Sequence, residues 1–323
     1  ENTDNPFEDG KPTAVMKSPP MVEPGSAPTK CVDNDLSCVE KRITSVRNDR
    51  EPPERYGGYA TEFHEQVMQA TQGHVVQPMD PMEFADTQKR TNQRIRNERF
   101  SRQGRGSAAK VSSFQKTELY TEPKPPRNIS TVKTEDTIDL GSFLNPLKTL
   151  LREHISWFAP CRNPTELTHM VHEFCSGRGK VVETDYSKFD GTLSRFLRAE
   201  VELPTLRALV APRFRTKFNA LFKRDRQLRA RTAHGVTYDT LNTRISGSQL
   251  TTVGNTLING FVAFTAHREA GKTPEQAFAM IGPKFGDDGL DDTEGLYSQT
   301  ANNLGLKLKE EVRDTERWVH FCG

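Results

Sequence analysis

Two predicted strands that carry acids lie about 100 residues apart, and a long helical pattern stands between them. Residues 180–185 predict a short buried strand that ends on an aspartate. Residues 286–289 predict the tip of a hairpin with two adjacent aspartates. Between them, a Ser-Gly pair leads into a predicted helix at about residues 250–269. This order of elements constrains the fold more than any single motif does.

The triplet Gly286-Asp287-Asp288 concentrates negative charge in a turn, which is unfavourable unless cations neutralise it. A calcium-binding loop is excluded, because Gly289 stands at its third position and no bidentate acid follows at the required place. Taken alone, the triplet would be better explained by an acidic surface turn.

The composition indicates a chain of 323 residues that is long enough for a sizeable core, with part of it unpacked. Residues 1–56 are rich in proline, glycine and acids and predict an extended or disordered leader. No apolar run reaches the ~18 residues of a membrane span. Five irregularly spaced cysteines favour reduced thiols over a disulfide framework. The chain begins with Glu and ends directly after an apolar stretch, so we expect it to be a segment of something larger.

Charge is distributed unevenly along the chain. Residues 89–133 carry 12 Lys and Arg against 3 acids, and residues 213–244 carry 9 against 2. Residues 285–323 reverse the balance, with 9 acids against 4 basic residues. Two basic stretches and one acidic stretch suit an enzyme that holds a polyanion near bound cations, although solvated helix faces would give the same counts.

Three motifs together resemble the palm domain of positive-strand RNA virus polymerases. Asp185 and Asp190 match the family's motif A, D-x4-D, and residues 286–288 match its motif C, G-D-D. Motif B, S-G-x3-T-x3-N, is matched by Ser246, Gly247, Thr251 and Asn255. The upstream run Lys-Pro-Pro-Arg-Asn-Ile-Ser at residues 124–130 is similar to nodavirus replicases. The chain is therefore identified as nodavirus-like over about residues 110–323.

The resemblance implies an α+β fold of the right-hand polymerase type, with an antiparallel palm sheet backed by helices, helical fingers and no thumb. Residues 57–180 would form fingers, including the basic motif F. Residues 181–323 would form the palm with motifs A to E, interrupted by a fingers insertion at about residues 192–245. Residues 318–323 resemble the start of the primer-grip hairpin, which predicts a strand at about residues 317–321.

The resemblance also implies roles for individual residues. Two Mg²⁺ (or Mn²⁺) ions would be held by Asp185, Asp287, Asp288 and the backbone carbonyl of Tyr186. A lysine of motif D, Lys307 or Lys309, would act in catalysis as a proton donor to pyrophosphate, and strand alternation places both on one face. Nucleotide binding would fall to Lys116, Lys124, Arg127, Asp190, Ser246, Gly247, Thr251 and Asn255.

The implied activity is template-directed ribonucleotide transfer by an RNA-directed RNA polymerase, with an RNA template, a nascent strand and NTPs as partners. The expected location is the host cytoplasm, in membrane-associated replication complexes reached through regions outside this chain. A reverse transcriptase or other palm nucleotidyltransferase is the alternative enzyme, against which the motif B residues argue. A non-enzymatic basic RNA-binding viral protein is the alternative of another class, and it would need no Mg²⁺.

Two other kinds of site have less support from the sequence. Cys161, His169, His172 and Cys175 have zinc-ligand chemistry, but the apolar residues between them favour an ordinary amphipathic helix. A Ser/His/Asp hydrolase is not indicated, because no nucleophile elbow is present.

Overall fold

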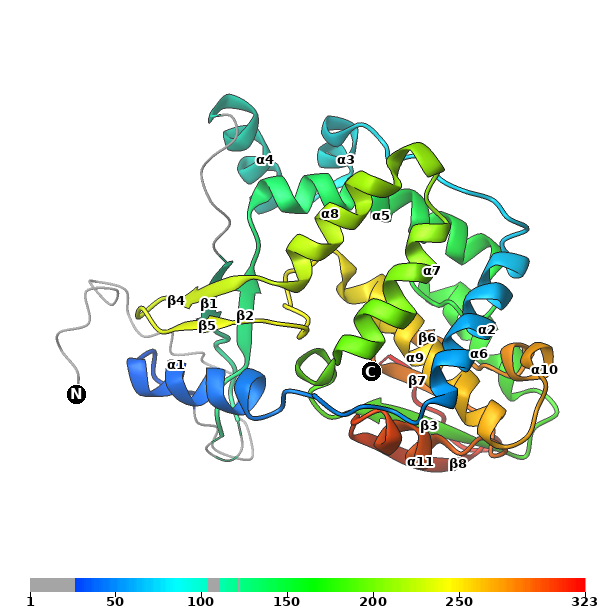
Figure 1. Cartoon of the computed structure of the whole chain (residues 1–323). Helices are drawn as coiled ribbons and strands as arrows, with labels where there is room; N and C mark the ends of the chain where they lie inside the picture. The colour runs from blue at the N-terminus through cyan, green and yellow to red at the C-terminus, as the bar shows by residue number, and fades with distance from the viewer. Residues whose placement is uncertain (1–26, 104–110, 121, 123, 323) are drawn as a thin grey trace.

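The computed structural model describes residues 27–103, 111–120, 122 and 124–322. Its strands are β1 Val111–Gln115, β2 Asn128–Thr131, β3 Lys180–Tyr186, β4 Arg229–Thr232, β5 Thr237–Asp239, β6 Lys284–Phe285, β7 Asp288–Asp291 and β8 Leu308–Asp314. Its α-helices are α1 Val32–Val39, α2 Arg55–Ala70, α3 Pro81–Thr87, α4 Thr91–Gln103, α5 Thr134–His154, α6 Pro164–Cys175, α7 Leu203–Ala208, α8 Arg215–Arg226, α9 Leu250–Glu269, α10 Pro274–Ala279 and α11 Tyr297–Asn303. Figure 1 shows the two sheets, with β1, β2, β4 and β5 on the left and β3, β6, β7 and β8 at the lower right.

The palm sheet has the strand order β6-β7-β3-β8, and all its pairings are antiparallel. The prediction of an antiparallel palm sheet is therefore confirmed. β3 lies at the centre of this sheet between β7 and β8, because its residues alternate between the two faces and those at Val181 and Val182 are buried. Helix α9 packs on β6, and α11 packs on β8. The acids at the ends of β3 and β7 are thus carried on neighbouring strands.

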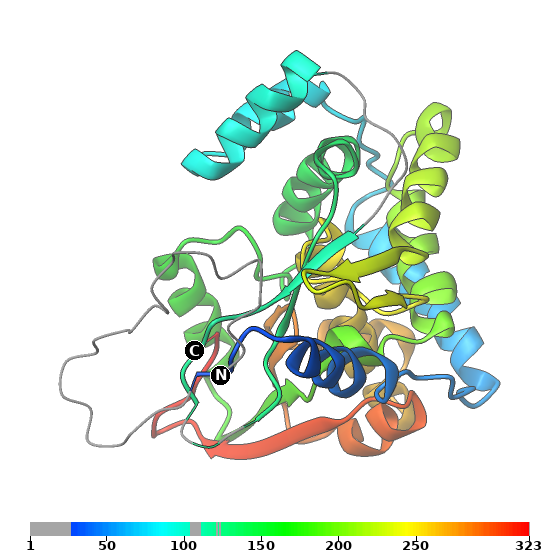
Figure 2. The same ribbon diagram turned by 90° about the vertical axis from the view of Figure 1, so that its left-hand side faces the viewer.

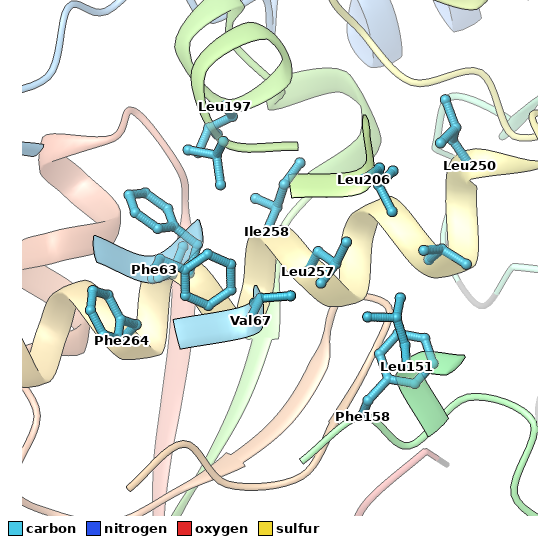
Figure 3. Packing of buried hydrophobic residues seen from close by; sticks show 14 of the residues in the cluster. Phe63, Val67, Leu151, Phe158, Leu197, Leu206, Leu250, Leu257, Ile258 and Phe264 are labelled. Carbon is cyan, nitrogen blue, oxygen red and sulfur yellow. The ribbon is translucent and has the colours of Figure 1, made fainter. Parts of the chain in front are cut away.

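Helix α9 is the centre of the main core. From Val253 to His267 every residue is buried, so the helix is covered on all sides rather than along one stripe. Figure 3 shows Leu257, Ile258 and Phe264 of this helix among side chains from α2, α5 and the segment after motif A. The predicted helix at about residues 250–269 is confirmed.

The fingers contain a second sheet of order β2-β1-β4-β5, in which β1 and β4 run parallel and the other pairs run antiparallel. The fingers, which were expected to be helical, therefore also contain a small mixed sheet. Its strands have three to five residues, and β4 alternates exposed arginines with buried Ala230 and Thr232. Such short polar strands carry little apolar signal, and the pairing of β1 with β4 joins residues more than 100 positions apart.

The N-terminal segment departs from the predicted extended leader. Residues 32–39 form α1, a π-helical turn follows at Glu40–Thr44, and Val39 and Ile43 are buried against β1, β4 and β5. Both views show α1 against the fingers sheet, with the chain then running toward the palm (Figures 1 and 2). These two buried apolar side chains, four positions apart, dock the segment on the sheet, which its polar composition concealed. Residues 1–26 of the predicted leader lie outside the described residues.

Polar contacts tie this segment to both halves of the molecule. Asp35 accepts hydrogen bonds from Gln115 Nε2 at 2.6 Å and contacts His234 Nδ1 at 2.9 Å, both in the fingers. Asn48 Nδ2 donates to the carbonyls of Thr192 at 2.8 Å and Leu304 at 2.7 Å, both on the palm side. We call residues 32–48 the brace, because they bridge fingers and palm.

The predicted strand at residues 317–321 is wrong. These residues have no strand partner, and the sheet instead ends with the seven-residue β8. His320 N donates to Glu183 Oε1 at 2.6 Å, so the chain crosses the edge of the palm sheet through a side-chain contact. The predicted domain boundaries are not tested by these features and stay a prediction.

Candidate active site

A cleft of about 520 Å³ opens between the palm and the fingers. Asp185 reaches it from the end of β3, and Asp287 reaches it from the turn between β6 and β7. β3 and β7 are hydrogen-bonded neighbours, so two acids that are 102 positions apart meet at one edge of the sheet. Other predicted site residues that line the cleft are Tyr186, Asp190, Arg127, Ser246 and Lys309.

The acids of this cleft repel one another. Burial, together with the negative charges of Asp190, Asp288 and Asp185, raises the pKa of Asp287 to about 6. Burial and the charge of Asp185 also raise the pKa of Asp288. Carboxylates that are buried and gathered in this way are unfavourable unless a cation or a proton neutralises them. The electrostatics therefore favour a bound cation at this position.

Asp288 faces a second hollow of about 400 Å³, which adjoins the cleft and shares Asp185 and Lys309 with it. Within the described ranges, no three His, Cys, Asp or Glu side chains form a group that could already hold a metal ion. Asp185 thus shares one hollow with Asp287 and the adjoining hollow with Asp288, and the acids do not form a finished coordination sphere. Their chemistry fits Mg²⁺ or Mn²⁺, because all are hard oxygen donors.

Lys309 contacts the first acid directly. It lies opposite Asp185 in the pairing of β8 with β3, and its Nζ donates to Asp185 Oδ2 at 2.9 Å. Lys307 precedes β8, is exposed and lines neither hollow. The two lysines are therefore not equivalent, and the geometry distinguishes Lys309 as the motif D lysine at the acids.

Side chains of helix α9 hydrogen-bond to the backbone of the acidic turn. Thr256 Oγ1 accepts a hydrogen bond from Gly286 N at 2.9 Å. Asn259 Nδ2 donates to the carbonyls of Gly286 and Asp288, each at 3.1 Å. The hydroxyl of Tyr186 is turned toward Asn259 Oδ1, at 3.4 Å. The position of the acids is thus fixed by a buried helix rather than by the turn alone.

The predicted ribose-binding residues divide into those at the cleft and those behind it. Asp190 lies at the cleft and accepts from Asn255 Nδ2 at 2.7 Å, while Asn255 is buried behind it. Burial raises the pKa of Asp190, and Asn255 and two arginines oppose that rise. Thr251 is turned away, because its hydroxyl donates to the carbonyl of Ile245 at 3.2 Å.

The Ser-Gly loop of motif B is docked on the fingers sheet. Ser246 Oγ lines the cleft and accepts a hydrogen bond from Ser130 N at 2.9 Å. Gly247 does not line the cleft; a Cβ at this position would lie 2.2 Å from the Ser130 carbonyl oxygen. Glycine is required here because β2 approaches so closely.

The predicted triphosphate-binding residues are only partly brought together. Arg127 lines the cleft and also a hollow of about 740 Å³ beside it, which Lys124 shares. Lys124 lies over the ring of Tyr120, with Nζ 4.6 Å from its centroid. Lys116 lines neither hollow, and its ammonium pairs with Glu118.

Sequence reasoning missed two arginines. Arg42, from the brace, lines both the cleft and the hollow beside it, and its carbonyl would lie 2.5 Å from a Cβ on Gly191 of motif A. Arg244 lines the cleft immediately before motif B and is only 1% exposed. The basic block at residues 213–244 carried a signal for Arg244, whereas nothing in the sequence distinguished Arg42 from other surface arginines.

Two negative findings concern the rest of the chain. The possible zinc ligands Cys161, His169, His172 and Cys175 do not form a metal-holding group in the described part of the structure. None of the described helices has the length and apolar character needed to cross a membrane.

The fold and this arrangement of acids are similar to those of viral polymerases of the palm type. The chain is 33% identical over 315 residues to the RNA-directed RNA polymerase of Striped jack nervous necrosis virus, a match that covers 94% of this chain and 32% of that protein. It is 32% identical over 323 residues to the RNA-directed RNA polymerase of Pieris rapae virus, covering 97% of this chain and 32% of that protein. No protein-family model matches the sequence.

A solved structure supports the same fold. The RNA-dependent RNA polymerase of a human picorbirnavirus, as an insertion loop deletion mutant, superposes with a TM-score of 0.66 at 16% identity, covering 87% of this chain and 60% of that chain. The resemblance to nodavirus RNA-directed RNA polymerases and the viral polymerase fold are therefore confirmed. The chain spans about a third of the length of the curated relatives it matches.

Proposed function

We propose that this chain is the catalytic core of an RNA-directed RNA polymerase. It would add ribonucleoside monophosphates to an RNA 3′-end under the direction of a template and release pyrophosphate. The observation that carries the proposal is the cleft in which Asp185 and Asp287, from neighbouring strands, lie beside Asp190 and Arg127. The names of relatives at 32–33% identity support the same activity.

The proposed cofactors are two Mg²⁺ or Mn²⁺ ions, with Asp185, Asp287, Asp288 and the Tyr186 carbonyl as their ligands. When bound, such ions activate the attacking 3′-hydroxyl and neutralise charge on the leaving pyrophosphate. The proposal is supported by the hard-oxygen chemistry of these groups and by the raised pKa values of Asp287 and Asp288. Lys309 neutralises Asp185 in the structure and would shift toward the phosphates when a cation binds.

The other residues of the cleft position the nucleotide. Arg127 would bind triphosphate oxygens through its planar fork, which suits bidentate contacts. Asp190 and Asn255 would recognise the 2′-hydroxyl, because a hydrogen-bonding group at the ribose separates RNA from DNA substrates. Lys309 is the proposed proton donor to pyrophosphate, since it alone of the two motif D lysines reaches the acids. The implied partners are an RNA template, the nascent strand and NTPs.

Template-dependent incorporation of a labelled ribonucleotide tests this function, measured with the chain extended to the length of its relatives. Asp287→Asn should abolish incorporation while leaving RNA binding intact, because it removes a proposed metal ligand and preserves shape. Asp239→Asn, on the exposed strand β5, is the matched control and should retain activity. Incorporation by the Asp287 variant would overturn the metal assignment. Mg²⁺-independent RNA binding without any incorporation by the unmodified protein would favour the non-enzymatic alternative.

A further inference from the structure

We propose that Arg244, held by Glu202 and Arg198, sets how strictly the cleft distinguishes ribose from deoxyribose. It does so as a positioning residue, by fixing the orientation of the Asn255 amide and, through it, of the Asp190 carboxylate. The inference rests on the proposed ribose role of Asp190 and Asn255, and it assigns the buried residues that orient these two side chains.

A continuous chain of polar contacts leads from the cleft into the protein. Asp190 Oδ1 accepts from Asn255 Nδ2 at 2.7 Å, and Asn255 Oδ1 accepts from Arg244 Nε at 3.0 Å. Arg244 Nη1 donates to Glu202 Oε1 at 2.7 Å. The other oxygen of Glu202 pairs with Arg198 Nε at 2.8 Å. Charges therefore alternate in sign from the cleft inward, so that each ion lies beside a partner of opposite charge.

The donor and acceptor chemistry allows the Asn255 amide only one orientation. A guanidinium can only donate hydrogen bonds, and an ionised carboxylate can only accept them. With Arg244 on one side and Asp190 on the other, the amide must present its oxygen to the arginine and its nitrogen to the aspartate. Asp190 Oδ2 has no hydrogen-bond partner in the described part of the chain. It is thus the oxygen left to accept a ribose hydroxyl.

The network has almost no freedom to rearrange. Arg198 and Glu202 are 0% exposed and Arg244 is 1% exposed, so none can exchange its partners for water. A Cβ on Gly254 would lie 1.9 Å from Glu202 Oε1 and 2.5 Å from Arg244 Nη2. The ions therefore press against the backbone of α9, one residue before Asn255. The main chain adds a further tie, because Arg244 N donates to the Asp190 carbonyl at 2.8 Å.

The buried end of the network, at Arg198, contacts the loop of motif B through Asp225. Arg198 Nη2 donates to Asp225 Oδ2 at 3.0 Å, and Asp225 Oδ1 accepts from Ser248 Oγ at 2.5 Å. Ser248 belongs to the loop whose Ser246 lines the cleft. The network thus joins the motif A aspartate, the motif B asparagine and the Ser-Gly loop. Buried ion pairs of this kind add little net stability compared with apolar residues of similar volume, so stability alone does not account for the arrangement.

The preference for ATP over dATP distinguishes a positioning role of Arg244 from a role in stabilising the fold alone. In the extended protein, kcat/KM is measured for ATP and for dATP on one template, with melting temperature measured in parallel. Arg244→Lys keeps the positive charge but loses the fork that contacts both Asn255 and Glu202. It should lower the ATP/dATP ratio by about tenfold, as expected for losing a hydrogen bond in a charged network. Glu202→Gln should act in the same direction.

Two further variants keep the test decisive. Leu206→Ala truncates a fully buried side chain on α7 outside the network, and it should lower the melting temperature without changing the ratio. Asp225→Asn is a milder change at the inner end, 8% exposed, and should lower the ratio by a smaller factor, about threefold. It reports on the network even if Arg244→Lys does not fold.

The possible outcomes separate the inference from the function it rests on. An unchanged ratio in Arg244→Lys and Asp225→Asn, with lowered melting temperatures as in Leu206→Ala, overturns the positioning role and leaves the polymerase intact. An unchanged ratio in Asp190→Asn overturns the ribose assignment and the inference together. A protein that incorporates neither nucleotide overturns the proposed function itself. A fall in the ratio confined to the network variants supports the inference.

Discussion

Replacing Asp287 with asparagine should stabilise the folded chain at neutral pH. Burial, with the charges of Asp190, Asp288 and Asp185 added, raises the pKa of Asp287 from the ordinary 3.8 to about 6. A shift of about two units corresponds to about 3 kcal/mol of unfavourable free energy when the group is ionised in the fold. Asparagine has nearly the same shape and no charge. The free energy of unfolding should therefore rise by up to about 3 kcal/mol.

The gain should depend on pH in a defined direction. The unfolded chain releases this proton near pH 3.8, whereas the folded chain keeps it up to about pH 6. Between these values the folded state binds more protons, so the stability contributed by Asp287 falls as the pH rises through the window and stays low above it. Asparagine is insensitive to pH. The difference between the variant and the unmodified chain should open between about pH 4 and 6 and be small near pH 4.

Urea unfolding followed by circular dichroism, without divalent ions, measures this difference at pH 4.5 and pH 7.5. Asp239→Asn on β5 is the control, and an exposed substitution of this kind should change stability by no more than about 0.5 kcal/mol. Adding Mg²⁺ should then stabilise the unmodified chain more than the Asp287 variant, since a ligand stabilises only the state that binds it. A variant that is no more stable at pH 7.5, or a gain that is equal at both pH values, would refute the reasoning.

Three further predictions concern other parts of the molecule. Arg42→Ala should raise the KM for NTPs about three- to tenfold with kcat little changed, because Arg42 lines the cleft and exposed Lys41 does not; an equal effect of Lys41→Ala would contradict it. Gly254→Ala should destabilise the fold by about 3 kcal/mol or more, because the added methyl group would clash with Glu202. Gly58→Ala, on an open face of α2, should stabilise the fold by about 0.5–1 kcal/mol. Urea unfolding that ranks the two variants the other way would refute the packing argument. RNA affinity should fall steeply between low and moderate salt, with a log–log slope of about −0.7 per phosphate contact; a flat response would show that the basic stretches do not hold RNA.

The sequence predicted the palm far better than the fingers, and the reason lies in the range of the interactions. α9 is specified locally by a long apolar run that ends at Gly271, where φ is +83°, so its bounds were predictable. The strand pair β1–β4 joins residue 111 to residue 230, and neither strand has a periodicity of its own. The difference between Lys307 and Lys309 likewise follows from the pairing of β8 with β3, which places Lys309 opposite Asp185.

The site residues show the same division. The acids and motif B could be found because their spacing along the chain is itself the signal. The position of Lys116 could not be predicted from the sequence, because only the structure shows its ammonium paired with Glu118 and the residue absent from the cleft lining. Arg42 could not be found either, since its place depends on the brace packing against Gly191, about 150 residues further along the chain.

Helix α9 connects motif B to both the Asp190 side chain and the acidic turn. Asn255 contacts Asp190, and Asn259, four residues later on the same face, contacts the main chain on both sides of Asp287. Four residues of helix rise about 6 Å. One rigid turn therefore sets the separation between the contact to Asp190 and the acidic turn. Because this part of the helix is buried on all sides, neither group can shift without disrupting the core. If Asp190 binds the ribose as proposed, this helix keeps the sugar contact at a fixed distance from the acidic turn.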